Sequence, residues 1–295
     1  MRRVGVRQGG EGGAAAGTGL AAVPVIGGGR AGDGWARHVP MVPHPGHGRG
    51  PGLRHRTGLA RPGRGQLRRM SSSQADPRRI AVLDVDGTLV DTNYQHALAW
   101  YRAFRSLGET FPVWRIHRLI GMGGDRLVGA LGGDEVEQRI GDDARERWVQ
   151  EADLLIGETA LLPGARELIV ALTERGHRVV LASSGKPHHV DRALDLLDAR
   201  ELADGWTTSE DVEETKPAPD LLQVALTKIG APIDAPAFVI GDSVYDVEAA
   251  KNAGMPAVVV RSGGFGDDEL RDAGAIAVYD TPADLMAALD ELDLT

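Results

Sequence analysis

Acidic, hydroxyl and lysine side chains follow the short apolar runs of this sequence. In chain order they are Asp84, Asp86, Ser183, Ser184, Lys216, Asp242 and Asp246. Carboxylates that are brought together repel one another unless a cation neutralises them, and hard oxygen ligands without His or Cys suit Mg²⁺. A hydroxyl and a lysine beside such carboxylates, at the start of a helix, are typical of a phosphate site. These residue types therefore predict a phosphate site that contains Mg²⁺.

Strands and helices that alternate along the chain position these residues. Apolar runs typical of buried strands cover 80–85, 178–182, 237–240, 256–260 and 275–279. Helical patterns cover 164–175, 188–197, 219–229, 244–253 and 282–292. This alternation predicts an α/β fold with a doubly wound parallel sheet, in which ligands bind at the carboxyl ends of the strands.

One interval interrupts the alternation. About 90 residues separate the first two apolar runs, far more than a crossover between parallel strands needs. Helical patterns fill the interval, at 94–107, 111–120, 125–131 and 135–156. We therefore expect an α/β core formed by residues 79–92 and 178–295, and an inserted, all-helical cap formed by residues 93–177 above the loop of the first strand.

Four motifs in order make the chain similar to a known family. Asp84–Thr92 resembles the first motif of the haloacid dehalogenase-like (HAD) hydrolases. Ser183 resembles the hydroxyl of the second motif, Lys216 the lysine of the third, and Gly241–Asp246 the acidic fourth motif. The resemblance covers essentially residues 80–290. It implies a Rossmann-like core with a helical cap, as in phosphoglycolate phosphatases and beta-phosphoglucomutases.

The resemblance also implies a role for each motif residue. Asp84 would be the nucleophile that forms an aspartyl-phosphate, and Asp86 the general acid and base. Mg²⁺ would lie between Asp84, the Asp86 carbonyl and Asp242. Ser183, Ser184 and Lys216 would bind the phosphate oxygens. Asp246 would orient a metal-bound water or Lys216 rather than bind the metal itself.

Three cap residues are candidates for substrate contacts. His96 lies in the first cap helix, where mutases and phosphatases of the family both carry a histidine. Gly121 belongs to a glycine-rich loop that we expect to dip toward the site, and Arg126 follows it by about one turn. Mutases of the family have basic residues near this loop that hold a second phosphate, where this chain has Ile120 and Gly124.

These observations favour a Mg²⁺-dependent phosphatase acting on a small phosphate monoester. A sugar-phosphate mutase is the first alternative, and a receiver-like phospho-acceptor module without catalysis is the second. Separately, Ser183 would also be explained as a helix N-cap, and Asp242 with Asp246 as a capping pair. Phosphonate cleavage would need a cap lysine, and residues 71–185 contain none. The metal-free dehalogenases lack the residue that corresponds to Asp86.

The first 69 residues differ in composition from the rest of the chain. They hold twelve arginines, no lysine or serine, two acidic residues and 19 of the 40 glycines. A segment so rich in Gly, Arg and Pro has no apolar period, which predicts a disordered leader over residues 1–78. Met70 is the expected functional start. An inert tail and a basic nucleic-acid-binding arm are the alternatives.

The remaining composition limits the partners. The chain has a net charge of −9, but after residue 69 it has 21 basic and 40 acidic residues, which argues against a nucleic-acid partner. The absence of cysteine excludes disulfides and thiol chemistry. No apolar stretch approaches 18 residues, so no membrane association is expected. We expect a cytoplasmic monomer or weak dimer that acts on a small phosphorylated metabolite.

Overall fold

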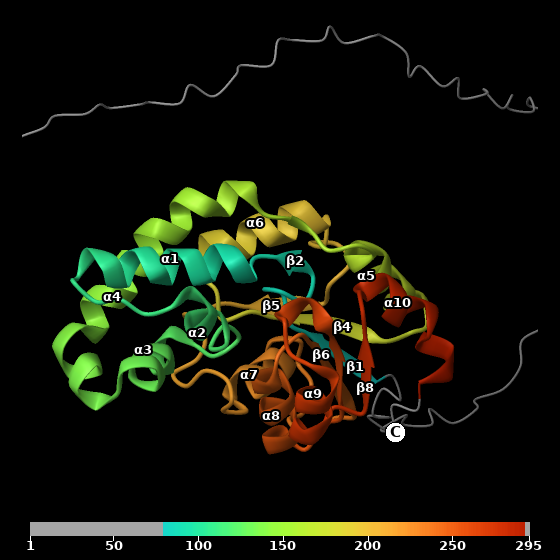
Figure 1. The fold of residues 1–295 in the computed structure, drawn as a ribbon. Helices are drawn as coiled ribbons and strands as arrows, with labels where there is room; N and C mark the ends of the chain where they lie inside the picture. Colours follow the sequence, from blue (N-terminus) through green and yellow to red (C-terminus); the bar gives the residue numbers. More distant parts are fainter. Residues whose placement is uncertain (1–78, 293–295) are drawn as a thin grey trace, which may run out of the picture. The chain divides into compact units, whose positions relative to one another are not determined.

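A computed structural model describes residues 79–292 (Figure 1). The predicted leader, residues 1–78, and the expected start at Met70 lie outside the described residues. Within the described part, no helix combines the length and apolar character needed to span a membrane.

Six parallel strands form the central sheet, in the order β5-β4-β1-β6-β7-β8. Their bounds are β1 Ile80–Leu83, β4 Arg178–Ala182, β5 Gly205–Thr207, β6 Ala237–Gly241, β7 Ala257–Val260 and β8 Ala277–Tyr279. Leu83 of central β1 is in register with Leu181 of β4 and Ile240 of β6. The residues that follow these three strands therefore emerge side by side at one edge of the sheet.

Helices cover both faces of the sheet, which confirms the predicted doubly wound fold (Figure 1). One face packs against α5 (Ala165–Glu174), α6 (Pro187–Leu197) and α10 (Pro282–Ala287). The other packs against α7 (Asp220–Lys228), α8 (Val244–Ala253) and α9 (Asp267–Ala273). Successive residues of β1 alternate between the two cores, as Val82 and Leu83 do, because side chains on a strand point to opposite faces. The described residues also form three short 3₁₀ helices: η1 (Ile156–Glu158), η2 (Arg261–Gly263) and η3 (Leu289–Glu291).

The inserted segment forms a helical cap with a core of its own. Its helices are α1 (Asn93–Ser106), α2 (Val113–His117), α3 (Gly124–Gly132) and α4 (Asp134–Leu155). Trp100, Phe104, Leu127 and Ile140 are among the buried residues of this core. The cap joins the sheet through β2 (Val90–Asp91) and β3 (Ala160–Leu161), which pair antiparallel. The chain thus enters and leaves the cap at one place.

Two details differ from the sequence-based expectations. The predicted cap boundary at residue 177 lies too far along the chain, because Leu168, Ile169 and Leu172 of α5 are buried in the same core as the sheet. The two-residue strands β2 and β3 were not predicted, and neither was strand β5. It has three residues, and its one large apolar side chain, Trp206, gives no run that can be recognised in the sequence.

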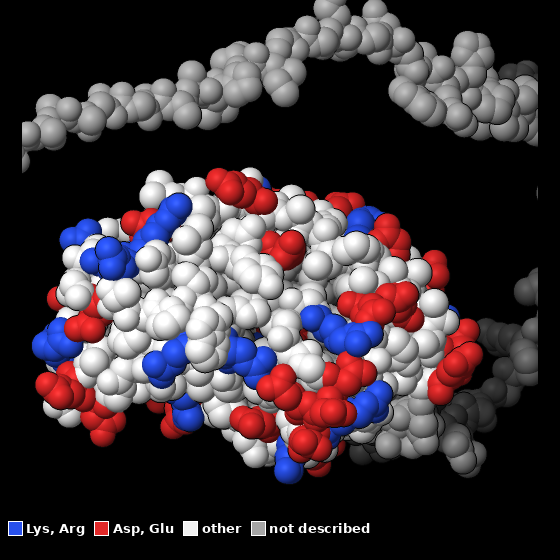
Figure 2. Space-filling model, in the orientation of Figure 1, with Lys and Arg blue, Asp and Glu red and all other residues white. Residues whose placement is uncertain are grey.

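Charged side chains of both signs are spread over the face shown in Figure 2. Acidic side chains gather where α9 lies, and the sequence of that helix contains Asp267, Asp268, Glu269 and Asp272.

Candidate active site

The turn after β1 presents two carboxylates at the edge of the sheet. Asp84 follows β1 directly, and its backbone N–H donates to the Ile240 carbonyl at 2.9 Å. Gly87 has φ +86°, and a Cβ there would collide with the side chains of Asp242 and Asn93. Only glycine allows this close turn, which brings the loop after β1 against the loop after β6.

Asp84 is buried among charged neighbours. The Lys216 ammonium donates to one of its carboxylate oxygens, and the Thr88 hydroxyl donates to the other at 2.9 Å. Burial, opposed by Lys216 and reinforced by the charges of Asp246 and Asp86, raises the pKa of Asp84 to about 7. An additional positive charge near this carboxylate would favour its ionised form.

Lys216 is held between two carboxylates. Its Nζ lies 2.7 Å from Asp246 Oδ1 and also contacts Asp84. Burial alone would lower the pKa of Lys216, but Asp246 and Asp84 raise it above its usual range. Asp246 is itself fixed at the start of α8, where it forms a capping box with Ser243. Asp246 therefore positions the ammonium that faces Asp84.

Asp242 follows β6 and lies beside the same cluster. Asn93 Nδ2 donates to Asp242 Oδ2 at 2.7 Å, and the Thr88 hydroxyl is 3.4 Å from Oδ1. Burial and the charges of Asp246 and Asp84 raise the pKa of Asp242 well above its usual value. The carboxylates of Asp84, Asp242 and Asp246 each offer an oxygen within 4.8 Å of the others. One lysine does not balance three buried carboxylates, so this all-oxygen donor set fits a hard divalent cation.

Asp86 has a different environment. Its carboxylate accepts hydrogen bonds from Thr92 Oγ1 at 3.0 Å and Ser183 Oγ at 3.1 Å, and His96 Nε2 lies 3.3 Å away. Burial would raise the pKa of Asp86, but the hydrogen bond and charge of His96, with the two hydroxyl hydrogen bonds, lower it to about 2. Asp84 and Asp86, two residues apart, therefore have opposite pKa shifts.

The loop after β4 forms the third side of the site. Ser183 is buried, its hydroxyl donates to Asp86, and it accepts the Gly185 N–H at 3.0 Å. Ser184, Gly185 and Lys186 line the cavity just before α6 begins at Pro187. Backbone N–H groups at the start of a helix favour an anion, which fits the predicted phosphate position.

A cavity of about 380 Å³ lies between these loops and the cap. Asp84, Asp86 and Lys216 line it from the sheet side. From the cap, Trp100 and Trp148 line it, with their rings stacked at 5.4 Å between centroids. The site thus combines a charged floor with a largely aromatic and apolar roof.

Comparison with known proteins places this geometry in a family. Residues 79–254 match the family model described as haloacid dehalogenase-like hydrolase. The chain belongs to the haloacid dehalogenase-like hydrolases. This membership confirms the resemblance noted in the motifs.

Individual members of the family align over most of their length. CbbY of Cereibacter sphaeroides is 32% identical over 225 residues, 72% of this chain and 96% of that protein. A phosphoglycolate phosphatase of Rhodospirillum rubrum is 32% identical over 221 residues, 70% of this chain and 89% of that protein. The crystal structure of a hydrolase from Pseudomonas syringae has a TM-score of 0.68 and 35% identity, covering 73% of this chain and 99% of that one.

The structure of this HAD-like hydrolase places the three predicted cap residues differently. His96 lines the cavity and contacts Asp86. Gly121 also lines it, has φ +98°, and leaves no room for a Cβ beside Ser243 and Tyr245, so its loop reaches the start of α8 in the core. Arg126 does not line the cavity. Its guanidinium is 2.8 Å from Glu214, an exposed ion pair between cap and core.

Several residues at the site of this hydrolase were not predicted. Asn93 bonds Asp242, Thr88 bridges Asp84 and Asp242, and Trp148 forms part of the roof. Thr88 lies within the first motif, so its place in the sequence could have indicated that it belongs to the site. Asn93 and Trp148 carry no such signal, because they depend on where α1 and α4 pack.

Proposed function

We propose that this hydrolase is a Mg²⁺-dependent phosphatase that cleaves a small phosphate monoester through an aspartyl-phosphate on Asp84. The observation that carries the proposal is geometric: Asp84 and Asp86 line one cavity with Lys216, and the carboxylates of Asp84 and Asp242 lie close enough to share a cation.

The reaction uses the two carboxylates in sequence. An Asp84 carboxylate oxygen attacks phosphorus, the bond from phosphorus to the alcohol oxygen breaks, and Asp86 protonates that alcohol. Water then attacks the aspartyl-phosphate, and Asp86 takes the proton that the water loses. Because the pKa of Asp86 is about 2 before substrate binds, Asp86 must gain a proton as the anionic substrate arrives. His96 Nε2 lies 3.3 Å from this carboxylate and contacts it directly.

The metal would be Mg²⁺. Asp84, Asp242 and the Asp86 carbonyl would hold it, while Asp246 holds Lys216. When bound, Mg²⁺ would screen the phosphate charge from the carboxylates. Lys216, Ser183 and the N–H groups after Ser183 would bind the phosphate oxygens.

The cavity indicates the kind of substrate. Its volume of about 380 Å³ is suited to a small metabolite, and its roof provides Trp100, Met122 and Trp148 for the non-phosphate part. Relatives that include a phosphoglycolate phosphatase support a small phosphorylated substrate. Interspersed surface charges with an acidic group at α9 support the prediction that nucleic acid is not a partner. A monomer or weak dimer remains our prediction.

A mutase would need a second group of residues that binds phosphate. In the loop at 120–125 the cavity is lined by Ile120, Met122, Asp125 and glycines, none of them cationic. Arg145, the cationic side chain that the cap contributes to the lining, is bound to Glu137 at 2.7 Å and Asp142 at 2.9 Å. This arrangement favours hydrolysis over phosphate transfer between sugar positions.

Phosphate release from a panel of small monoesters, with and without Mg²⁺, tests the proposal. We expect Mg²⁺-dependent release by the full chain and no release by Asp84→Asn. Turnover only with a sugar bisphosphate activator, without free phosphate, would identify a mutase instead. Stable phosphorylation without turnover would identify a receiver-like module.

A further inference from the structure

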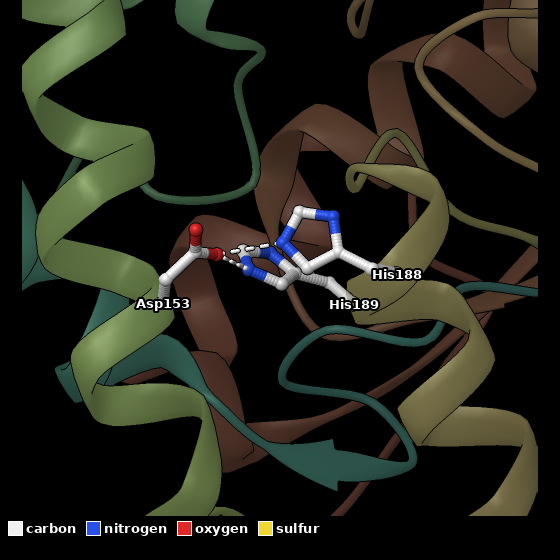
Figure 3. A group of neighbouring side chains, drawn as sticks. All are labelled: Asp153, His188 and His189. Atoms are coloured by element: carbon white, nitrogen blue, oxygen red, sulfur yellow. Dashed lines mark hydrogen bonds and ion pairs between the residues drawn. The ribbon is translucent and has the colours of Figure 1, made fainter.

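A second group of metal-ligating side chains lies where the cap meets the core. Asp153 comes from α4 of the cap, and His188 and His189 from the first turn of α6 on the sheet (Figure 3). The Nε2 atoms of His188 and His189 lie 2.6 Å and 2.8 Å from the same oxygen, Asp153 Oδ1. Figure 3 shows both imidazoles pointing from one helix toward the carboxylate on the other.

We propose that Asp153, His188 and His189 bind a Zn²⁺-class divalent cation that joins the cap to the core. Two imidazoles and one carboxylate form a common donor set of protein zinc sites, and imidazole suits zinc better than it suits Mg²⁺. The site thus differs in chemistry from the all-oxygen cluster of Asp84 and Asp242.

The three ligand atoms would need only small shifts to coordinate an ion. Each residue offers one ligand atom, and the three atoms lie within 4.8 Å of one another. A tetrahedral zinc ion separates its ligand atoms by about 3.4 Å, so the two N···O distances would lengthen by roughly 0.7 Å. Asp153 and His188 are exposed and can move by this amount, because their side chains are 45% and 57% accessible. That exposure also leaves a fourth ligand position open to water.

His189 is fixed before any ion binds. It is 3% exposed, and its ring lies 6.3 Å from the Trp148 ring and 6.4 Å from the His96 ring. Among the described residues, the Nδ1 atom of His189 has no hydrogen-bond partner, whereas its Nε2 atom contacts Asp153. Nε2 is therefore the ring nitrogen that faces the proposed ion.

The start of α6 carries a partial positive charge that works against a cation. This effect amounts to less than about tenfold in affinity at a helix terminus. Three direct ligands contribute far more than this. The carboxylate from the facing helix also balances part of the added charge.

A bound ion would act on the cap. Asp153 moves with α4, whereas His188 and His189 move with the sheet, so opening the cap would require a metal–ligand bond to break. Trp148, on the same helix as Asp153, also lines the catalytic cavity. We therefore expect occupancy to slow the release of product and lower kcat; this consequence rests on the proposed function.

The test measures binding of Zn²⁺ to the full chain by calorimetry, with Mg²⁺ in excess to occupy the acidic cluster. Asp153→Asn preserves a hydrogen-bond acceptor of the same shape but removes the charged ligand, and His188→Gln removes an exposed ligand. Asp143→Asn is the matched control, because it makes the same change on the same helix outside the cluster. The histidines at 38, 44, 47 and 55 are common to all variants.

We expect Asp153→Asn and His188→Gln each to weaken one Zn²⁺ site by tenfold or more, and Asp143→Asn to match the unmodified chain. Bound Co²⁺ should give the visible absorption of a low-symmetry site, lost in the same two variants. Equal Zn²⁺ affinity in the unmodified chain and Asp153→Asn would overturn the proposal and leave a hydrogen-bonded cluster only.

Activity gives a separate readout. Zn²⁺ should lower kcat of the unmodified chain and of Asp143→Asn, but not of Asp153→Asn. Tight binding with an unchanged kcat would refute the effect on the cap. A chain that binds Zn²⁺ but has no phosphatase activity would contradict the proposed function and leave the metal site standing.

Discussion

Asp86→Asn should convert the enzyme into one that accepts a phosphoryl group and then stalls. Asparagine has the size of aspartate and keeps an acceptor for the Thr92 hydroxyl, 3.0 Å away, while its amide can donate to Ser183. The change in ground-state hydrogen bonding is therefore about 1 kcal/mol. Loss of proton transfer by a general acid or base costs 10²–10⁴-fold in rate, or about 3–5 kcal/mol. The chemical effect dominates.

The choice of substrate separates the two steps. The p-nitrophenolate group leaves without a proton, so attack by Asp84 on p-nitrophenyl phosphate does not need Asp86. Hydrolysis of the aspartyl-phosphate does need Asp86 to take a proton from water. A rapid-mixing assay should therefore show a burst of about one p-nitrophenolate per enzyme, followed by a steady rate 10²–10⁴-fold below that of the unmodified enzyme.

Two variants control this experiment. Asp84→Asn has no nucleophile and should show no burst. Asp91→Asn changes an exposed aspartate of β2 that does not line the cavity, and should turn over normally. Steady turnover by Asp86→Asn near the normal rate would refute the acid–base role. Complete loss of the burst would show that Asp86 is needed for the first step itself.

Four further predictions follow from the same geometry. Lys216→Met should lower kcat/KM at least 10²-fold while leaving a folded protein, because it removes the cation beside Asp84, as steady-state kinetics and circular dichroism will show. Asn93→Ala should lower the free energy of unfolding by about 1.5–3 kcal/mol in urea titrations, because it leaves buried Asp242 without its amide donor. Gly121→Val should cost about 1–2 kcal/mol in the same titrations and also reduce kcat/KM, since the residue has φ +98° and faces the core. With EDTA present, stability should fall as the pH rises from about 4 to about 7, because the raised pKa values of Asp84 and Asp242 make their ionisation unfavourable in the folded state; the fall should be smaller in Asp84→Asn, and an equal fall in both proteins would contradict the contribution of Asp84.

The sequence predicted those parts of the fold that depend on short, local runs of apolar residues. Buried parallel strands are short apolar runs, and β1, β4, β6 and β7 were recognised from such runs. β5 was missed because a three-residue strand at the sheet edge needs no apolar run. The end of the cap was placed too late because an amphipathic helix such as α5 does not reveal which neighbour covers its apolar side.

The candidate site was predictable to the extent that parallel topology aligns strand ends. Once β1, β4 and β6 are neighbours, Asp84, Ser183 and Asp242 must approach one another. The contacts from the cap depend instead on tertiary packing. His96 reaches Asp86 and Arg126 pairs with Glu214, although the sequence made both candidates for substrate contacts. The raised pKa of Asp84 depends on burial and on Asp246, which is distant in sequence, whereas the lowered pKa of Asp86 depends mainly on His96 and Thr92, which lie six to ten residues further along the chain.

The two-residue pairing of β2 with β3 has a consequence for how such enzymes diversify. Val90 pairs with Leu161 and Asp91 pairs with Ala160, so the chain leaves the core for the cap and returns to it through one two-stranded ribbon. A different helical insert could be spliced in at this point without altering the register of β1 with its neighbours. Exchange of the segment between Asp91 and Ala160 with that of a relative that keeps equivalents of Thr92, Asn93 and His96, which bond the carboxylates of the floor, should therefore transfer the roof of the cavity as a module, and with it the choice of substrate.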